Sequence, residues 1–219
     1  MFPIGDENHG RRRFPFVTYI FIAINVIVFL IELLYGDEFI LRWSFVPARF
    51  LDNPGGDFIT LFTSMFMHAG WLHLLGNMLY LFIFGDNVED AFGHLPFLIF
   101  YLICGIAATF AQLAFSANSN IPNLGASGAI AGVLGAYLVM FPRSRVTVLM
   151  GMIVVPLPAL VVIGFWFVLQ LFSGIAAITA VPTGAEEGGV AYMAHVGGFI
   201  AGLILAFIFR PRNRAQVQI

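Results

Sequence analysis

Long apolar runs without charged side chains recur along the whole chain, separated by shorter polar segments. The hydrocarbon core of a bilayer is about 30 Å thick, so a helix that crosses it needs roughly 20 mostly apolar residues. Six runs have this character, and we predict a membrane-spanning helix in each. The predicted spans are Phe16–Leu34, Trp71–Phe84, Leu95–Phe115, Gly125–Phe141, Ala159–Phe172 and Val190–Phe209.

The polar segments between these runs are predicted to be loops. The longest lies between the first two spans and contains the helix-breaking Pro-Gly-Gly stretch at 54–56. An acidic loop is expected at Gly85–Asp90, and His94 is expected to lie in a loop as well. Glu32, near the outer end of the first span, is expected to snorkel to the interface or to contact a loop.

The basic residues indicate how the spans are oriented. The chain has no lysine, and eight of its ten arginines lie at the N-terminus, between the fourth and fifth spans, or at the C-terminus. Basic loops tend to stay in the cytoplasm, so all three regions are expected there. The apolar run Val146–Ile178 must then cross only once, at about Ala159–Phe172, with Val146–Val155 near the inner interface.

Composition agrees with a membrane protein and argues against other classes. Hydrophobic residues make up 60% of the 219 residues and charged residues 10%, with a formal net charge of -2. The mean hydropathy of +0.92 is too high for an ordinary water-soluble domain. A single cysteine, Cys104, excludes an internal disulfide framework. No basic and aromatic surface is present for nucleic acid.

These features together divide the chain into three parts. No cleavable signal peptide is expected, because the apolar run after the first arginines is long enough to span and no small-residue cleavage site follows it. We therefore predict a cytoplasmic tail (1–15), a six-helix domain (16–209) and a second cytoplasmic tail (210–219). The fold class is an all-α membrane protein, and a prokaryotic plasma membrane is the expected location.

Polar residues inside the spans gather at one depth. His68, His73 and Asn77 lie at the outer start of the second span, Ser127 at the outer start of the fourth, and His195 in the outer part of the sixth. At a rise of 1.5 Å per residue this depth is roughly 10 Å below the outer surface. Ionisable side chains are costly in a bilayer and usually mark function or internal pairing. The sequence therefore predicts a polar site here.

The residue types at this site favour acyl transfer. A serine hydroxyl is a poor nucleophile until a base removes its proton, and histidine suits that role near neutral pH. Ser127 is the candidate nucleophile and His195 the candidate base. His73 and Asn77 are four residues apart, hence on one helix face, and both can donate hydrogen bonds to a developing oxyanion. The unpaired N–H groups at the start of the helix that carries Ser127 can do the same.

Small residues give these helices a reason to touch. Gly125 and Gly128 flank the serine, and glycines recur along the fourth span, while Gly198 and Gly202 form a small-xxx-small pair in the sixth. Such faces let membrane helices approach closely. Other interpretations remain for the single residues: His195 could tether two helices, and His68, His73 and Asn77 could form a metal site or a polar packing cluster.

The motifs resemble those of the rhomboid family of intramembrane serine proteases. The resemblance rests on the segment HAGWLHLLGN (68–77) continuing into FGDNVED (84–90), on GASG (125–128), and on Ala194-His195 followed by the glycine pair of the last span. It covers nearly the whole chain and implies a six-helix core. It also implies a Ser127–His195 dyad, an oxyanion site of His73 and Asn77 with the Ser127 N–H, and His68 in support.

The same resemblance implies further properties. We expect a cavity open to the outside and a gate formed by the fifth span and the loop before the last span, at about Gly174–Gly189. Expected partners are transmembrane protein substrates and the lipid bilayer. No metal, cofactor or nucleic acid is expected, and no oligomeric state is predicted. The alternatives are a non-catalytic relative that binds or moves membrane clients, or a transporter or channel.

The sequence departs from many family members at two places. Ile59-Thr60 stands where they have a Trp-Arg pair in the first loop, which leaves the anchoring of that loop unexplained. Ala131 stands where some have a tyrosine against which the histidine packs. Trp166 and Tyr192 are the candidates to replace that tyrosine.

Overall fold

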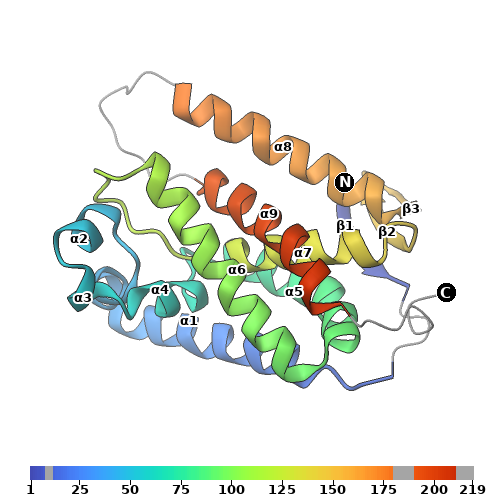
Figure 1. Ribbon diagram of the computed structural model, residues 1–219, viewed down its shortest axis with the longest axis horizontal. Helices are drawn as coiled ribbons and strands as arrows, with labels where there is room; N and C mark the ends of the chain where they lie inside the picture. Colours follow the sequence, from blue (N-terminus) through green and yellow to red (C-terminus); the bar gives the residue numbers. More distant parts are fainter. Residues whose placement is uncertain (8–11, 180–189, 211–219) are drawn as a thin grey trace.

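The computed structural model describes residues 1–7, 12–179 and 190–210, and in this part of the chain helices dominate (Figure 1). Each predicted span coincides with one long helix. These are α1 (Phe16–Trp43), α5 (Trp71–Phe92), α6 (His94–Phe115), α7 (Ser127–Met140), α8 (Ala159–Thr179) and α9 (Tyr192–Phe209). The predicted class, an all-α membrane bundle of rhomboid-like type, is confirmed.

These helices differ in how well they suit a membrane crossing. By length and hydropathy α1, α6, α8 and α9 are each able to cross. α5 qualifies together with the segment Pro54–Phe66 before it, to which it is bent by 77°. α7 is apolar but has only 14 residues. The chain is thus an integral membrane protein, and a total of six crossings stays a prediction.

Helix α9 occupies the middle of the bundle, between α7 and α6, while α8 lies along its edge (Figure 1). Glycines make the central contact possible. A Cβ atom added at Gly198 would overlap the carbonyl oxygen of Gly128, and one added at Gly202 would overlap that of Gly132. The two backbones therefore touch directly, as the small-residue faces predicted.

A three-stranded antiparallel sheet, which the sequence did not predict, closes one end of the molecule. Its order is β1 (Phe2–Asp6), β2 (Arg145–Met150) and β3 (Ile153–Pro158). The expected cytoplasmic tail at 1–15 thus contributes a strand, and the apolar segment expected near the inner interface forms a hairpin. Prolines 156 and 158 are tolerated because β3 is an edge strand. α8 then starts at Ala159, as predicted.

The acidic segment after the second span is not a loop, which corrects the prediction. α5 continues through Gly85–Asp90 and ends at Phe92, before Gly93 with φ 88°. His94 is the first residue of α6 and not a loop residue. Of the three acidic side chains in this segment, Asp86 and Glu89 are buried within the fold, and Asp90 accepts the backbone N–H groups of Arg12 and Arg13.

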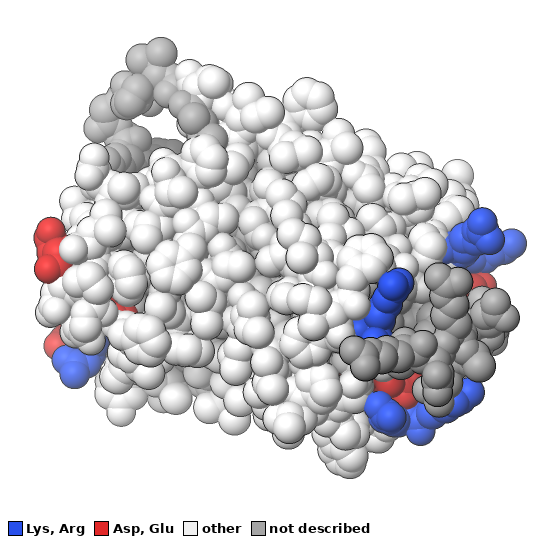
Figure 2. Space-filling view, in the orientation of Figure 1, with Lys and Arg blue, Asp and Glu red and all other residues white. Residues whose placement is uncertain are grey.

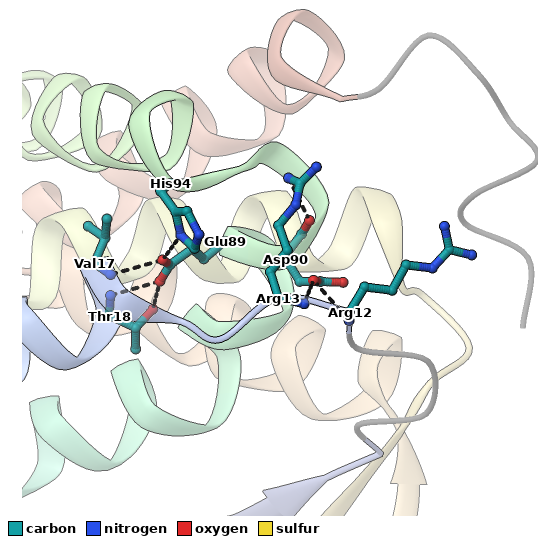
Figure 3. A network of polar contacts seen from close by, with 7 residues as sticks. All are labelled: Arg12, Arg13, Val17, Thr18, Glu89, Asp90 and His94. Atoms are coloured by element: carbon teal, nitrogen blue, oxygen red, sulfur yellow. Dashed lines mark hydrogen bonds and ion pairs between the residues drawn. The ribbon is translucent and has the colours of Figure 1, made fainter.

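Glu89 is the centre of this pairing (Figure 3). Its carboxylate accepts the backbone N–H groups of Val17 (2.9 Å) and Thr18 (2.8 Å), and one oxygen lies 2.6 Å from Nδ1 of His94. The first N–H groups of a helix lack intrahelical partners, and α1 has no side-chain cap of its own. A residue of α5 therefore caps α1 from 72 positions away.

The first loop is largely helical. α1 runs past the predicted end at Leu34, breaks at Gly36 (φ 65°, ψ -151°) and reaches Trp43. The short helices α2 (Pro47–Asp52), α3 (Pro54–Asp57) and α4 (Thr60–Thr63) and the 3-10 helix η1 (Ser64–Phe66) follow. Arg49 anchors this region by bonding the Asp57 carboxylate and the Ser44 carbonyl. It supplies the anchoring that the missing Trp-Arg pair left unexplained.

Charged side chains gather at the two ends of the molecule, and the face between them is uncharged (Figure 2). The end with the sheet carries most of the arginines visible in this view. That distribution is the one expected for a bundle whose middle lies in hydrocarbon.

Candidate active site

Ser127 and His195 are hydrogen-bonded, with 2.8 Å between the serine Oγ and the histidine Nε2. Ser127 is the first residue of α7, and His195 lies in the first turn of α9. The glycine contact between these helices brings the two side chains together from positions 68 residues apart. His195 is buried and Ser127 half-buried, so the pair lies below the protein surface but within reach of a cavity.

A cavity of about 700 Å³ opens beside this pair. Its lining includes His73, Asn77, Ser127 and His195, so four of the five polar residues predicted to share one depth surround one space. The remaining one, His68, is buried behind it, with its ring edge-on to that of His73 at 5.1 Å between centroids.

His73 and Asn77 present hydrogen-bond donors to this cavity. Nδ1 of His73 accepts the backbone N–H of Ala69 at 3.4 Å, so in the neutral ring the proton sits on Nε2. The amide nitrogen of Asn77 is buried and has no hydrogen-bond partner in the described protein. A buried donor without a partner is costly unless something else accepts its hydrogen. These two donors are therefore free to act on an oxygen in the cavity.

The start of α7 supplies further donors. The first helical hydrogen bond runs from the Ile130 N–H to the Ala126 carbonyl (3.0 Å). The N–H groups of Ser127 and Gly128 precede that bond and point out of the helix start, where the helix dipole is positive. An oxyanion formed at Ser127 would meet them.

Gly125 shapes the approach to the serine. Its φ of 134° lies in the region that favours glycine. A Cβ atom here would lie 2.9 Å from Cε1 of His73 and 3.5 Å from the Ser127 Oγ. Glycine is therefore required both by the backbone and by the space between these side chains. Gly128 has a packing role, because its added Cβ would overlap that of Ala108 on α6.

Glu32 links the first helix to the site. It is buried, and both its carboxylate oxygens accept the backbone N–H of His68, at 3.2 and 3.1 Å. The expected loop contact is therefore present, whereas snorkelling is wrong. Through this bond α1 holds the turn that precedes the helix carrying His73.

Two residues of α8 complete the surroundings of His195. Oε1 of Gln170 lies 2.8 Å from Nδ1 of His195, and the Trp166 ring lies 5.9 Å from the imidazole between centroids. Trp166, one of the two candidates, thus packs beside the histidine where Ala131 offers no ring. The sequence prediction missed Gln170. Its signal was the lone side-chain amide in the apolar run Ala159–Phe172.

Comparison with known proteins identifies the family. The model of the Rhomboid domain matches residues 55–212, which is most of the chain. The chain belongs to the rhomboid family. The sequence is 28% identical over 207 residues to "Rhomboid protein 1, mitochondrial" of Saccharomyces cerevisiae, covering 92% of this chain and 56% of that protein. It is 31% identical over 202 residues to "Rhomboid protease GluP" of Bacillus subtilis, covering 87% of this chain and 35% of that protein.

A third rhomboid relative matches over more of its own length. "Rhomboid protease GlpG" of Salmonella paratyphi A is 26% identical over 223 residues, covering 93% of this chain and 71% of that protein. By contrast, the chain spans about half of the yeast protein and about a third of GluP. The relatives include mitochondrial, plant and bacterial proteins, so they do not single out the prokaryotic plasma membrane expected from the sequence.

Proposed function

We propose that this rhomboid protein is an intramembrane serine endopeptidase that hydrolyses peptide bonds in or near the transmembrane segments of other proteins. The single observation that carries the proposal is the 2.8 Å hydrogen bond between Ser127 and His195 at the wall of a cavity. Non-catalytic binding of membrane clients, the alternative, would need neither this bond nor donors aimed into the same space.

The proposed reaction has two stages. His195 Nε2 takes the Ser127 proton as Oγ attacks the substrate carbonyl carbon, and the carbonyl oxygen becomes an oxyanion. When the peptide C–N bond breaks, the histidine gives that proton to the leaving amine. A water then attacks the acyl-enzyme and loses a proton to His195; when the ester bond to Ser127 breaks, His195 returns that proton to the serine Oγ and the acid product is released.

The oxyanion would be held by the donors that surround the cavity. His73 Nε2–H, the Asn77 amide and the Ser127 N–H are the candidates. Donors already oriented in a site with little water stabilise such charge strongly, and one of them is typically worth 10²–10³ in kcat. No metal or cofactor enters this scheme.

The substrate must expose a carbonyl to Ser127. In a membrane helix each carbonyl is hydrogen-bonded within the helix, so the substrate has to unwind locally. We expect small residues at the cleaved bond and helix-breaking residues near it. With the sheet end in the cytoplasm, the site would face the extracytoplasmic side and cleave near the outer end of the substrate segment.

The test is cleavage of a model transmembrane substrate in liposomes. Wild type is expected to cleave it, and Ser127→Ala and His195→Ala to lose nearly all activity. Val168→Ala, on the exposed face of α8, is the matched control and is expected to cleave normally. Undiminished cleavage by either dyad variant would end the proposal. A fluorophosphonate probe should also label wild type at Ser127 and leave Ser127→Ala unlabelled.

A further inference from the structure

Gln170 is a polar side chain on the otherwise apolar helix at the edge of the bundle. It is half-buried, and its amide oxygen lies 2.8 Å from Nδ1 of His195. The opposite ring nitrogen, Nε2, is 2.8 Å from the Ser127 Oγ. The imidazole is thus held at both ends, by α7 through the serine and by α8 through the glutamine.

These two contacts determine which nitrogen carries the proton. A neutral imidazole has one N–H, and the hydrogen bond at one nitrogen sets the state of the other. An amide oxygen only accepts hydrogen bonds, so the N–H belongs on Nδ1. Nε2 is then left unprotonated and accepts the hydrogen of the Ser127 hydroxyl. This is the tautomer that a base at Nε2 requires.

We propose that Gln170 is a positioning residue that holds His195 in the Nδ1–H tautomer and aims Nε2 at Ser127. The inference rests on the proposed function and deepens it, because it adds a third group to what the sequence predicts as a dyad. When His195 takes the serine proton, the same amide oxygen faces a charged imidazolium and stabilises it as a dipole. The acceptor is neutral and belongs to α8, so catalytic geometry depends on that helix lying against α9.

Packing alone does not account for this arrangement. Trp166, one helical turn before Gln170, already packs beside the imidazole, so the ring has an apolar neighbour on α8 without Gln170. A side-chain amide in a membrane helix is retained at a cost unless its hydrogen bond is used. The Gln170 bond goes to Nδ1 of His195. In the neutral ring a proton on Nδ1 leaves Nε2 free to act as a base.

The charged surroundings of His195 are simple enough for a pH test. α8 carries no titratable side chain at all, α7 presents Ser127, and α6 presents the neutral Gln112. The titratable groups that share the cavity are His73 and Tyr80 on α5. A charge introduced at position 170 would therefore be the nearest new influence on the imidazole.

The experiment compares Gln170→Met, Gln170→Glu and Val168→Ala with wild type, by substrate cleavage across pH and by the rate of fluorophosphonate labelling. Methionine keeps the shape of the side chain and loses the acceptor, so kcat and the labelling rate should fall and KM should stay unchanged. We expect a loss of about ten- to a hundredfold, the size seen when a partner that orients a metal-bound histidine is removed. Gln170→Glu keeps a hydrogen-bond acceptor at this position and should therefore be more active than Gln170→Met. Its carboxylate also favours the imidazolium, so the acid limb of the profile should move to higher pH.

The outcomes separate this inference from the proposed function. The positioning role would be overturned, and the dyad would stand, by either of two results. One is that fluorophosphonate labels Gln170→Met as fast as Val168→Ala. The other is that the pH profile of cleavage by Gln170→Glu coincides with that of wild type. Wild type that neither cleaves nor labels would overturn both. If Gln170→Met fails to fold, as judged by circular dichroism and thermal melting, the pH profile of Gln170→Glu decides alone.

Discussion

The proposed chemistry depends on the surroundings of one imidazole, that of His195. His195 contacts the proposed nucleophile Ser127, the amide oxygen of Gln170 and the ring of Trp166, which come from two other helices. Each contact restricts a different property: Ser127 the direction of Nε2, Gln170 the tautomer, and Trp166 the plane of the ring. A histidine restricted in all three ways needs little rearrangement before it can accept a proton.

The first prediction concerns pH. Wild-type cleavage should fall as the solution is acidified, because protonated His195 cannot accept the Ser127 proton. The acid limb of kcat/KM should follow a single proton, and fluorophosphonate labelling should decline in parallel because it needs the same base. Folding measured at each pH by circular dichroism is the control. Turnover with no acid limb at any pH at which the protein stays folded would contradict the role of His195.

At the scale of elements, the decisive contact is the glycine seam between α7 and α9. Backbone touches backbone at Gly128–Gly198 and at Gly132–Gly202, which fixes the distance between the helix that carries Ser127 and the helix that carries His195. α8 is different, because it lies at the edge of the bundle. α7 and α9 are therefore held together by direct backbone contact, whereas α8, the third helix of the site, packs against them from the edge of the bundle.

A substitution of one of these glycines should therefore lower the free energy of unfolding by more than the small size of the added group suggests. In Gly202→Ala the new methyl group would overlap the Gly132 carbonyl, and the helices must separate. Overpacking of this kind costs about 1–3 kcal/mol, so the melting temperature in detergent and the labelling of Ser127 should both fall. Gly164→Ala is the matched control, since a Cβ there meets nothing within 4 Å. Equal melting temperatures for the two variants would contradict the seam.

The gate implied by the family resemblance allows a second prediction at this scale. Most of its loop, residues 180–189, lies outside the described residues, but α8 ends beside the start of α9. A Cβ at Gly174 would lie 3.3 Å from that of Tyr192, close to the roughly 3.5–4.5 Å of disulfides. The oxidised double variant Gly174→Cys/Tyr192→Cys should label with fluorophosphonate yet cleave transmembrane substrates slowly.

Reduction supplies the control for that experiment. Dithiothreitol should restore cleavage in the double variant and leave wild type unchanged, since Cys104 is buried and single. Rapid substrate cleavage by the fully oxidised protein would show that α8 need not separate from α9 for entry.

On the face of the molecule that Figure 2 shows, charged side chains lie at the two ends and the middle is uncharged. At the sheet end, β1 pairs with the hairpin that lies between α7 and α8. In the sequence, eight of the ten arginines precede α1, lie between α7 and α8, or follow α9. The opposite end carries α2 and α3. By the positive-inside tendency the sheet end should be cytoplasmic.

Cysteine labelling of intact cells expressing the protein tests this orientation. Met152→Cys, 98% exposed in the hairpin turn, should react with a membrane-impermeant maleimide only after lysis. Gly55→Cys, exposed in α3, should react in intact cells. Buried Cys104 keeps the background low. The reverse pattern would invert the topology and place the cavity towards the cytoplasm.

The apolar pattern and the placement of charge along the sequence predict the positions of the helices and the polar residues of the site. They located six helices to within a few residues at most ends and showed that the segment before Ala159 does not cross. They also identified Ser127, His73, Asn77 and His195 as polar groups of one site. These inferences succeed because a bilayer makes long apolar runs helical and leaves polar residues there only for a reason.

Contacts between segments far apart in the sequence become visible only in the folded protein. Glu89, in the part of α5 that continues past the predicted end, caps α1 from 72 positions away, and β1 pairs with β2 across at least 140 positions of the sequence. In the sequence, Gln170 is a single polar residue in an apolar run. Its meaning depends on which helix face meets His195, and the packing of α8 on α9 sets that face, whereas sequence spacing alone leaves it open.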